Sequence, residues 1–171
     1  MDWLDFKEFI KDSIWHIITF VLVFLFVVYV ISFGQVIGPS MKNTLNNGDI
    51  ILVSKLNYKF SSPKKNDIIA FNMKGIKFAV KRVIGVPNDK IVIKNNKVYV
   101  NNELLDESYI IESTNSSDKD YGVLGEDEYF VLGDNREDST DSRRFGYVKK
   151  SDIIGKVIIK LYPFNEIKLI K

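Results

Sequence analysis

Hydrophobic positions divide the chain into one long apolar stretch and a series of short apolar runs. No residue between Ser13 and Met41 carries a formal charge, and residues 14–33 are apolar almost throughout. A stretch of about 20 such residues is what a helix needs to cross the hydrocarbon core of a bilayer. A cleaved signal peptide would have a shorter apolar region of about 7–15 residues and a small-residue cleavage site, and no such site precedes Ser40. The pattern therefore predicts one uncleaved transmembrane helix over residues 14–33.

After residue 33 the pattern changes to short β-branched and aromatic runs separated by Asn, Gly, Pro and Asp, which is typical of a β-rich domain. Two of these runs flank the turn Lys94-Asn95-Asn96-Lys97, which predicts a β-hairpin. No second long helical pattern follows. We therefore expect a mainly β fold preceded by one N-terminal transmembrane helix, with strands at residues 50–55, 67–71, 76–86, 91–93, 98–100, 129–132 and 153–161.

Charge is balanced over the chain. The formal net charge is +2 from 24 basic and 22 acidic residues, which gives no support to nucleic acid as a partner because that would need a concentrated basic face. The tail before the apolar stretch carries Lys7, Lys11 and the amino terminus, whereas residues 34–53 carry Lys42 as their only base. The positive-inside rule then predicts that residues 1–13 are a short cytoplasmic tail and that residues 34–171 lie outside the cell membrane.

The side chains that are missing limit the chemistry. The chain has no cysteine, and its single histidine, His16, lies inside the predicted helix, where we interpret it as an interfacial polar residue. Thiol nucleophiles, disulfides and cysteine metal sites are excluded, and a Ser-His-Asp triad cannot form in the domain after the helix. If the chain is a hydrolase, serine paired with lysine is the combination that remains.

Lys81 and Arg82 are adjacent in one of the expected strands. Side chains alternate along a strand, so the two cations point to opposite faces, each among apolar neighbours. One interpretation is an edge strand from which both side chains reach solvent. The other is that the lysine is held out of water, which lowers its pKa from about 10.4 and leaves a neutral fraction that can act as a general base.

Ser40 lies in the loop segment Gly38-Pro39-Ser40-Met41. A serine in a loop is usually a solvated or turn-forming hydroxyl. Here Gly38 allows unusual backbone conformations and Pro39 fixes φ, so the pair can present the Ser40 hydroxyl and its backbone N–H at the edge of a groove. That N–H can stabilise an oxyanion formed from an attacked carbonyl. A second oxyanion donor is not identified.

A third polar segment, residues 133–146, mixes acidic and basic side chains. One interpretation is a solvated loop with surface ion pairs, each of which contributes little. A calcium loop fits poorly, because Arg136 falls where an acidic or amide ligand is needed. The functional interpretation is a buttress in which Ser139 hydrogen-bonds a neutral lysine while Asp141 and Arg143 fix the shape of the loop.

Taken in order, these segments resemble the type I signal peptidases, the membrane-anchored Ser/Lys endopeptidases of bacteria, in a compact Gram-positive-like form. The resemblance rests on Ser40-Met41, Gly48-Asp49-Ile50 with Lys55, Lys81-Arg82-Val83-Ile84-Gly85, and Gly133-Asp134-Asn135-Arg136 continuing through Ser139, Asp141 and Arg143 to Gly146. It implies that Ser40 is the nucleophile and contributes its N–H to the oxyanion hole, that Lys81 is the general base, and that Ser139 orients the lysine. Asp141 and Arg143 would be the structural pair behind them, and Arg82, Asp134 and Arg136 would be supports rather than catalysts.

The family also implies an activity and an organisation. Its members cleave signal peptides from exported preproteins after small residues, in an Ala-x-Ala pattern, and need no metal or cofactor. Residues 34–171 would form the peptidase domain, with a smaller inserted β-region at residues 91–127. The implied partners are signal peptides, the lipid bilayer and the secretion translocon, with the chain assumed to be a monomer.

The sequence departs from the family at three loop positions. Asn43 replaces a usual proline, Asn88 replaces a usual glycine, and Gly38 stands where some members place a second oxyanion-hole serine. Asparagine tolerates turn and left-handed conformations, so we expect Asn43 and Asn88 to affect the stiffness of their loops more than the chemistry.

Three other functions fit the pattern less well. An inactive relative could serve as a membrane-anchored assembly or chaperone module, but that would be favoured by loss of the serine or the lysine, and both are present. A membrane-tethered β-domain could have a binding role alone. A self-cleaving repressor uses a similar Ser/Lys fold, but it would carry a DNA-binding module where this chain has its apolar stretch.

Overall fold

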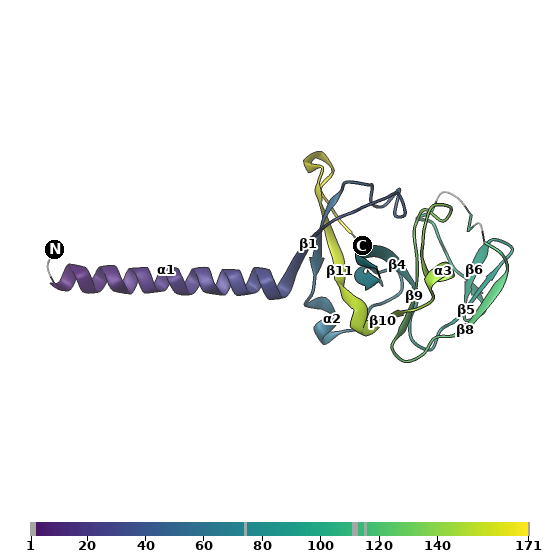
Figure 1. Cartoon of the computed structure of the whole chain (residues 1–171), viewed down its shortest axis with the longest axis horizontal. Helices are drawn as coiled ribbons and strands as arrows, with labels where there is room; N and C mark the ends of the chain where they lie inside the picture. Colours follow the sequence, from purple (N-terminus) through teal and green to yellow (C-terminus); the bar gives the residue numbers. More distant parts are fainter. Residues whose placement is uncertain (1–2, 74, 111–112, 115, 171) are drawn as a thin grey trace.

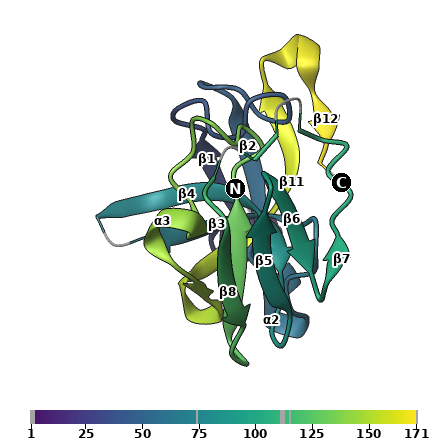
Figure 2. The same cartoon turned by 90° about the vertical axis from the view of Figure 1, so that its right-hand side faces the viewer.

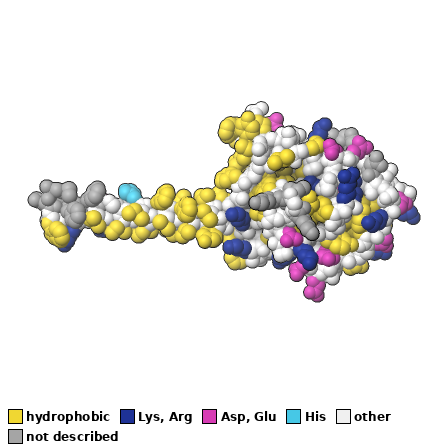
Figure 3. All heavy atoms as spheres, viewed as in Figure 1, with side chains coloured by type: hydrophobic (Ala, Val, Ile, Leu, Met, Phe, Trp, Pro, Cys, Tyr) yellow, Lys and Arg dark blue, Asp and Glu magenta, His cyan; other side chains and the backbone are white. Residues whose placement is uncertain are grey.

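A long helix projects from a β-rich domain (Figure 1). The computed structural model describes residues 3–73, 75–110, 113–114 and 116–170. The helix is α1 (Trp3–Val30). Its segment Ile10–Val30, of 21 residues, is long and apolar enough to cross a membrane, and no part of that segment is buried in the protein. Apolar side chains accordingly cover most of the projecting helix (Figure 3). The fold is mainly β with one N-terminal apolar helix, as the sequence predicts.

Both ends of α1 differ from the predicted limits. The helix begins at Trp3, inside the expected tail, and ends at Val30 instead of residue 33. It ends early because the next residues form β1 (Ile31–Gln35), whose backbone pairs antiparallel with β2 (Ile50–Ser54). Residues 31–33 therefore belong to the sheet and not to the helix.

Lys55, directly after β2, holds the end of the helix. Its N–H donates to the Val30 carbonyl at 2.9 Å, and its ammonium donates to the Val28 carbonyl at 2.9 Å. A helix leaves its last carbonyls without intrahelical partners, and a cation there also complements the helix dipole. Lys55 thus fastens α1 to the domain.

Most of the domain is one antiparallel sheet. In the described residues its eight strands take the order β1-β2-β11-β3-β4-β9-β10, with β12 paired to β11. All seven predicted strands are present, with ends that agree to within two residues. The strands not yet given are β3 (Ile68–Met73), β4 (Ile76–Gly85), β9 (Glu128–Leu132), β10 (Val148–Lys149), β11 (Ile153–Tyr162) and β12 (Lys168–Leu169), and the short helices are α2 (Asn57–Phe60), α3 (Ser142–Phe145), η1 (Lys150–Asp152) and η2 (Phe164–Glu166).

A second sheet lies at the end of the molecule away from α1 (Figures 1 and 2). Its order is β7-β6-β5-β8, built from β5 (Lys90–Lys94), β6 (Lys97–Val100), β7 (Glu103–Leu104) and β8 (Lys119–Val123). The hairpin of β5 and β6 is the one predicted. Asn95 and Asn96 have φ of 51° and 59°, and a two-residue type I′ turn requires positive φ at both positions.

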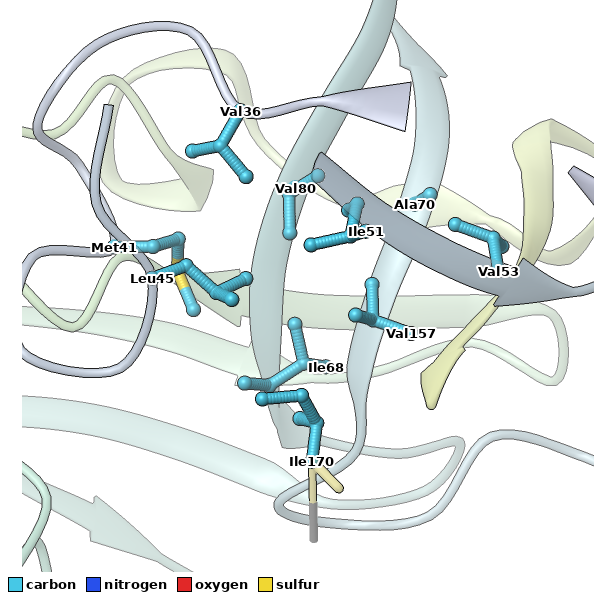
Figure 4. Close-up of a cluster of buried hydrophobic side chains, with 10 residues drawn as sticks. All are labelled: Val36, Met41, Leu45, Ile51, Val53, Ile68, Ala70, Val80, Val157 and Ile170. Carbon is cyan, nitrogen blue, oxygen red and sulfur yellow. The ribbon is translucent and has the colours of Figure 1, made fainter. Parts of the chain in front are cut away.

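The core next to Ser40 holds that serine's loop in place (Figure 4). Met41 and Leu45, which follow Ser40, are completely buried there. Full burial of such a side chain contributes about 1.5–3 kcal/mol, so the loop is anchored on the core instead of moving freely in solvent. The rest of this cluster consists of Val36, Ile51, Val53, Ile68, Ala70, Val80, Val157 and Ile170.

Candidate active site

Strand β4 carries Lys81 and Arg82 into the interior. They expose 6% and 5% of their surface, so the edge-strand interpretation, with both cations in solvent, is wrong. Because successive side chains of a strand point to opposite faces, the two cations have different partners. Lys81 forms a hydrogen bond with Ser40, and Arg82 forms one with Asp134.

Lys81 and Ser40 are within hydrogen-bonding distance of each other. Lys81 Nζ lies 2.7 Å from Ser40 Oγ and also donates to the Val80 carbonyl at 3.0 Å. Burial lowers the pKa of Lys81 below its ordinary value, although the negative charges of Asp141 and Asp134 act in the opposite direction. A neutral amine at this distance can accept the proton of the serine hydroxyl.

Backbone contacts hold the Ser40 loop against the loop after β9. The N–H of Asn135 donates to the Ser40 carbonyl at 3.0 Å, and its side-chain amide donates to the Pro39 carbonyl at 3.3 Å. Within the described part of the chain the N–H of Ser40 has no hydrogen-bond partner, so it is free to donate to a ligand. The N–H of Gly38 is engaged by Asn47 Oδ1 at 2.8 Å and is not a free second donor.

Arg82 and Asp134 form a buried bidentate ion pair. Arg82 Nε and Nη2 donate to the two carboxylate oxygens at 2.8 and 2.7 Å. Thr44, in the Ser40 loop, donates to the same carboxylate at 2.5 Å, and the guanidinium lies 4.1 Å from the ring centre of Tyr109. Bidentate pairs fix orientation as well as charge, so this one ties β4 to both loops.

Asp141 and Arg143 form a second buried pair. Asp141 is fully buried and accepts two bonds from the Arg143 side chain, each of 2.8 Å, and one from the Gly133 N–H at 3.1 Å. Residues 133–146 are therefore not a solvated loop with surface ion pairs. The described residues contain no group of three or more acidic, histidine or cysteine side chains placed to hold a metal ion.

Ser139 does not make its predicted contact with Lys81. Its Oγ is buried and has no hydrogen-bond partner among the residues described. The side chain instead packs over Gly133, where an added methyl group would overlap both Ser139 and the Ser40 carbonyl. The lysine uses the Ser40 hydroxyl and the carbonyl of residue 80 instead. A buried hydroxyl without a hydrogen-bond partner lowers the stability of the fold by about 1–3 kcal/mol. The Ser139 hydroxyl is such a group, and it can still form a hydrogen bond.

Arg136 links the same loop to a segment that no sequence motif marks. Its buried guanidinium donates to the Gly133 carbonyl at 2.8 Å and to Thr114 at 2.6 Å, and it forms an ion pair with Glu107. Burial raises the pKa of Glu107, and the charge of Arg136 partly offsets that effect. Glu107, Tyr109 and Thr114 lie between β7 and β8 without a periodic pattern, so the sequence gives no signal for their role.

The two asparagines that depart from the family pattern both have positive φ, of 87° at Asn43 and 69° at Asn88. Asparagine adopts such conformations more readily than most residues, which is how Asn88 can stand in for glycine. Proline holds φ near about −65°, so the loop at Asn43 has a shape that proline cannot take.

A groove of about 260 Å³ leads away from Ser40 and Lys81. Residues 35–37 line one side and residues 78–81 of β4 line the other. Because three strands lie between β1 and β4 in the sheet, the sheet must curl for both to line the same groove. Within the described residues β1 pairs with β2 alone and residues 76–81 pair with β3 alone, so both strands present an unpaired edge to the groove.

Known proteins resemble this chain in sequence and in structure. A family model described as "Signal peptidase, peptidase S26" matches residues 7–162. Signal peptidase IB of Staphylococcus aureus is 34% identical over 179 residues, which cover 95% of this chain and 94% of that protein. Signal peptidase I of Bacillus caldolyticus is 37% identical over 156 residues, covering 81% and 83%. The crystal structure of a signal peptidase I from Enterococcus faecalis matches with a TM-score of 0.51 and 33% identity, over 56% of this chain and 97% of that chain.

Proposed function

The chain belongs to the signal peptidase family, peptidase S26, and from this we propose that it is a membrane-anchored serine endopeptidase that cleaves signal peptides from exported preproteins. One observation carries the assignment of the site. Ser40 Oγ and Lys81 Nζ lie 2.7 Å apart where the groove begins, and the lysine is buried. In this proposal Ser40 is the nucleophile and Lys81 is the general base.

The reaction is an acyl transfer in two halves. Neutral Lys81 takes the hydroxyl proton of Ser40 as Oγ bonds to the carbon of the scissile carbonyl. The C–N bond then breaks, and protonated Lys81 gives its proton to the leaving amine. In the second half a water molecule gives a proton to Lys81 and attacks the acyl-enzyme. The proton returns to Ser40 Oγ as the signal peptide leaves, and no step requires a metal or cofactor.

The groups around Ser40 and Lys81 have two proposed roles, to stabilise the charge on the attacked carbonyl oxygen and to hold the two side chains in place. The free N–H of Ser40 is the proposed oxyanion donor, because preorganised donors stabilise the charge that develops on the carbonyl oxygen. The pairs of Arg82 with Asp134 and of Asp141 with Arg143 keep β4 and the two loops in register, and Arg136 braces the loop after β9.

The unpaired edges of β1 and β4 support binding of an extended substrate. A preprotein segment can add as a strand between them, with main-chain hydrogen bonds for affinity and side-chain pockets for specificity. Val36, Met41 and Val80 contribute apolar side chains to the lining of the groove. Small residues such as alanine at the first and third positions before the cut are the side chains proposed to fit there.

The apolar helix supports a single-pass membrane location, with residues 1–13 in the cytoplasm and the peptidase domain outside. Confinement of enzyme and membrane-tethered preprotein to one surface raises their effective concentration. The short connection from α1 to Ser40 keeps the cut near the membrane, where the signal helix of the substrate ends.

Cleavage of an Ala-x-Ala precursor by the purified full-length protein in detergent tests this proposal. We expect Ser40→Ala and Lys81→Ala each to lower kcat/KM by about 10³-fold or more, the order expected for loss of a nucleophile or a general base. Exposed residues of the same types are matched controls, so Ser151→Ala and Lys94→Ala should cleave at the wild-type rate.

Unchanged cleavage by either Ser40→Ala or Lys81→Ala would overturn the assignment of the pair. A wild-type protein that leaves every precursor intact, under conditions where an active member of the family cleaves them, would favour the inactive assembly or chaperone module instead.

A further inference from the structure

Tyr109 reaches from the small sheet to the ion pair beside the catalytic lysine. It lies between β7 and β8 and packs on an apolar cluster whose side chains come largely from β4, β5, β6 and β9. The guanidinium of Arg82 lies over its ring, with the guanidinium carbon 4.1 Å from the ring centre. Tyr109 therefore connects the small sheet to the strand that carries Lys81.

The other contacts of the Arg82 guanidinium come from the main sheet and its loops. They are the bidentate pair with Asp134, a bond of 3.1 Å to the Asn66 carbonyl and one of 3.3 Å to the Thr44 hydroxyl. Tyr109 offers a different kind of contact. The face of an aromatic ring attracts a cation, and the attraction is stronger out of water, where Arg82 lies. The ring is thus a separate restraint on the position of the guanidinium.

The position of Arg82 affects Lys81 through the charge of Asp134. Burial lowers the pKa of Lys81, and the negative charges of Asp141 and Asp134 act to raise it. Arg82 places a positive charge directly against the Asp134 carboxylate. With Arg82 displaced, that carboxylate would act on Lys81 with less compensation. More of the lysine would then be protonated at a given pH.

We propose that Tyr109 is a positioning residue for catalysis, whose ring holds the Arg82 guanidinium in place against Asp134. The proposal rests on the proposed function, because it concerns how well Lys81 serves as the general base. Tyr109 is not among the residues that line the groove, so it acts through Arg82 and not through the substrate. The small sheet thereby contributes to catalysis from outside the groove.

The charged groups around Tyr109 are the same in every variant of this residue considered below. Glu107 from its own segment, Arg136 and Asp134 from the loop after β9, and Arg82 from β4 all act on it. Burial raises the pKa of Tyr109 to about 12, so its hydroxyl is neutral at lower pH. An uncharged replacement therefore removes no charge. Its effect on Lys81 has to come from a change in the position of a charged neighbour, and Arg82 is the one over the ring.

Two variants without the ring, Tyr109→Leu and Tyr109→Met, test the proposal on the full-length protein in detergent with an Ala-x-Ala precursor. We expect the acid limb of the pH profile, where kcat/KM rises as Lys81 loses its proton, to move to higher pH. At a pH on that limb kcat/KM should fall by about 2–30-fold, the factor that corresponds to the strength of a cation–π contact. The fall should be in kcat with KM unchanged, since Tyr109 does not line the groove.

Tyr109→Phe is the conservative variant. It keeps the ring and removes a hydroxyl that is buried and has no hydrogen-bond partner within the described part of the chain. Because the face of the ring is retained, Tyr109→Phe should restore the position of the limb and the kcat that Tyr109→Leu loses. A limb displaced equally in Tyr109→Phe and Tyr109→Leu would contradict a role for the ring.

Tyr99→Leu is a control matched in residue type. Tyr99 lies on β6 of the same small sheet, between Val98 and Val100, which point into the apolar cluster, so its own side chain points away from it. The limb, kcat and KM of Tyr99→Leu should be those of wild type.

Circular dichroism and urea unfolding show whether each variant has the native fold. A wild-type limb and kcat in folded Tyr109→Leu and Tyr109→Met would overturn the inference and leave the proposed function standing. So would a lower kcat without a shift of the limb, or failure of both variants to fold, because the ring would then act on the core alone. Failure of wild type to cleave any precursor would instead count against the proposed function.

Discussion

Among single residues, Lys81 is held where a positive charge is unfavourable. It is buried, and its close partners are a neutral hydroxyl and a carbonyl. Burial lowers its pKa below 10.5, so the amine becomes neutral at a lower pH than in an unfolded chain. We expect kcat/KM for precursor cleavage to rise with pH along an acid limb whose midpoint lies below 10.5. A pH profile with its limb at 10.5 would contradict the burial argument.

The lowered pKa of Lys81 should also make the free energy of unfolding depend on pH. Between the folded-state pKa of Lys81 and 10.5 the unfolded chain holds one more proton at this site than the folded chain, so the free energy of unfolding rises with pH there. Lys81→Met removes this contribution. Urea unfolding measured across that window should therefore give a flatter dependence on pH for Lys81→Met than for wild type.

The sequence pointed to Ser40 and Lys81 as a candidate pair because the missing histidine and cysteine side chains left few alternatives, and the structure places the two side chains 2.7 Å apart. The sequence placed the Ser139 hydroxyl against Lys81, a contact that is not made, because the direction of that hydroxyl depends on how the side chain packs over Gly133. Glu107 was equally hidden, because its burial depends on a contact with Arg136 that is distant in sequence.

Among the elements, β11 is joined to the start of β2 by a buried ion pair. Lys160 Nζ lies 2.8 Å from Asp49 and 2.6 Å from Glu166, and the lysine is 1% exposed. Removal of one partner from a buried pair costs about 3–5 kcal/mol, and Glu166 remains to compensate in part. We expect Asp49→Ala to lower the free energy of unfolding by about 3 kcal/mol, measured by urea unfolding followed by circular dichroism.

Two further variants check the origin of that loss. Asp49→Ala/Lys160→Met removes both charges and should recover much of the stability, because no unpaired charge is left buried. Asp120→Ala breaks an exposed pair with Lys90 and should change stability little. Equal losses for Asp49→Ala and Asp120→Ala would show that burial of the pair is unimportant.

The longer strands were predictable because their apolar alternation is visible over four or more residues. The strands β7, β10 and β12 have two residues each, too few to show any period, and they exist through pairing with a neighbour. The end of α1 was misplaced because residues 31–33 are as apolar as a membrane helix, while pairing with β2 determines their conformation.

For the molecule as a whole, the positive-inside rule predicts which side of the membrane holds the domain. The absence of cysteine allows single cysteines to report this without background. We expect Lys94→Cys, in the small sheet, to react with a membrane-impermeant maleimide in intact cells, and Lys7→Cys to react after permeabilisation. The opposite pattern would reverse the orientation.

The sequence pattern predicts a mainly β domain after an apolar helix, but it does not predict the shape of the groove. The groove exists because a sheet in the order β1-β2-β11-β3-β4 curls until its first strand faces β4. That order depends on pairings between residues far apart in the chain, such as Lys156 with Ser54, and short-range periodicity carries no information about them.

Two hydrogen bonds from Lys55 to the last turn of α1 join the helix directly to the β-domain. With α1 in the bilayer as proposed, a tilt of the helix to match the bilayer thickness would turn the whole domain with it. We then expect the distance of the Ser40 hydroxyl from the lipid surface to depend on the ten residues that follow Val30.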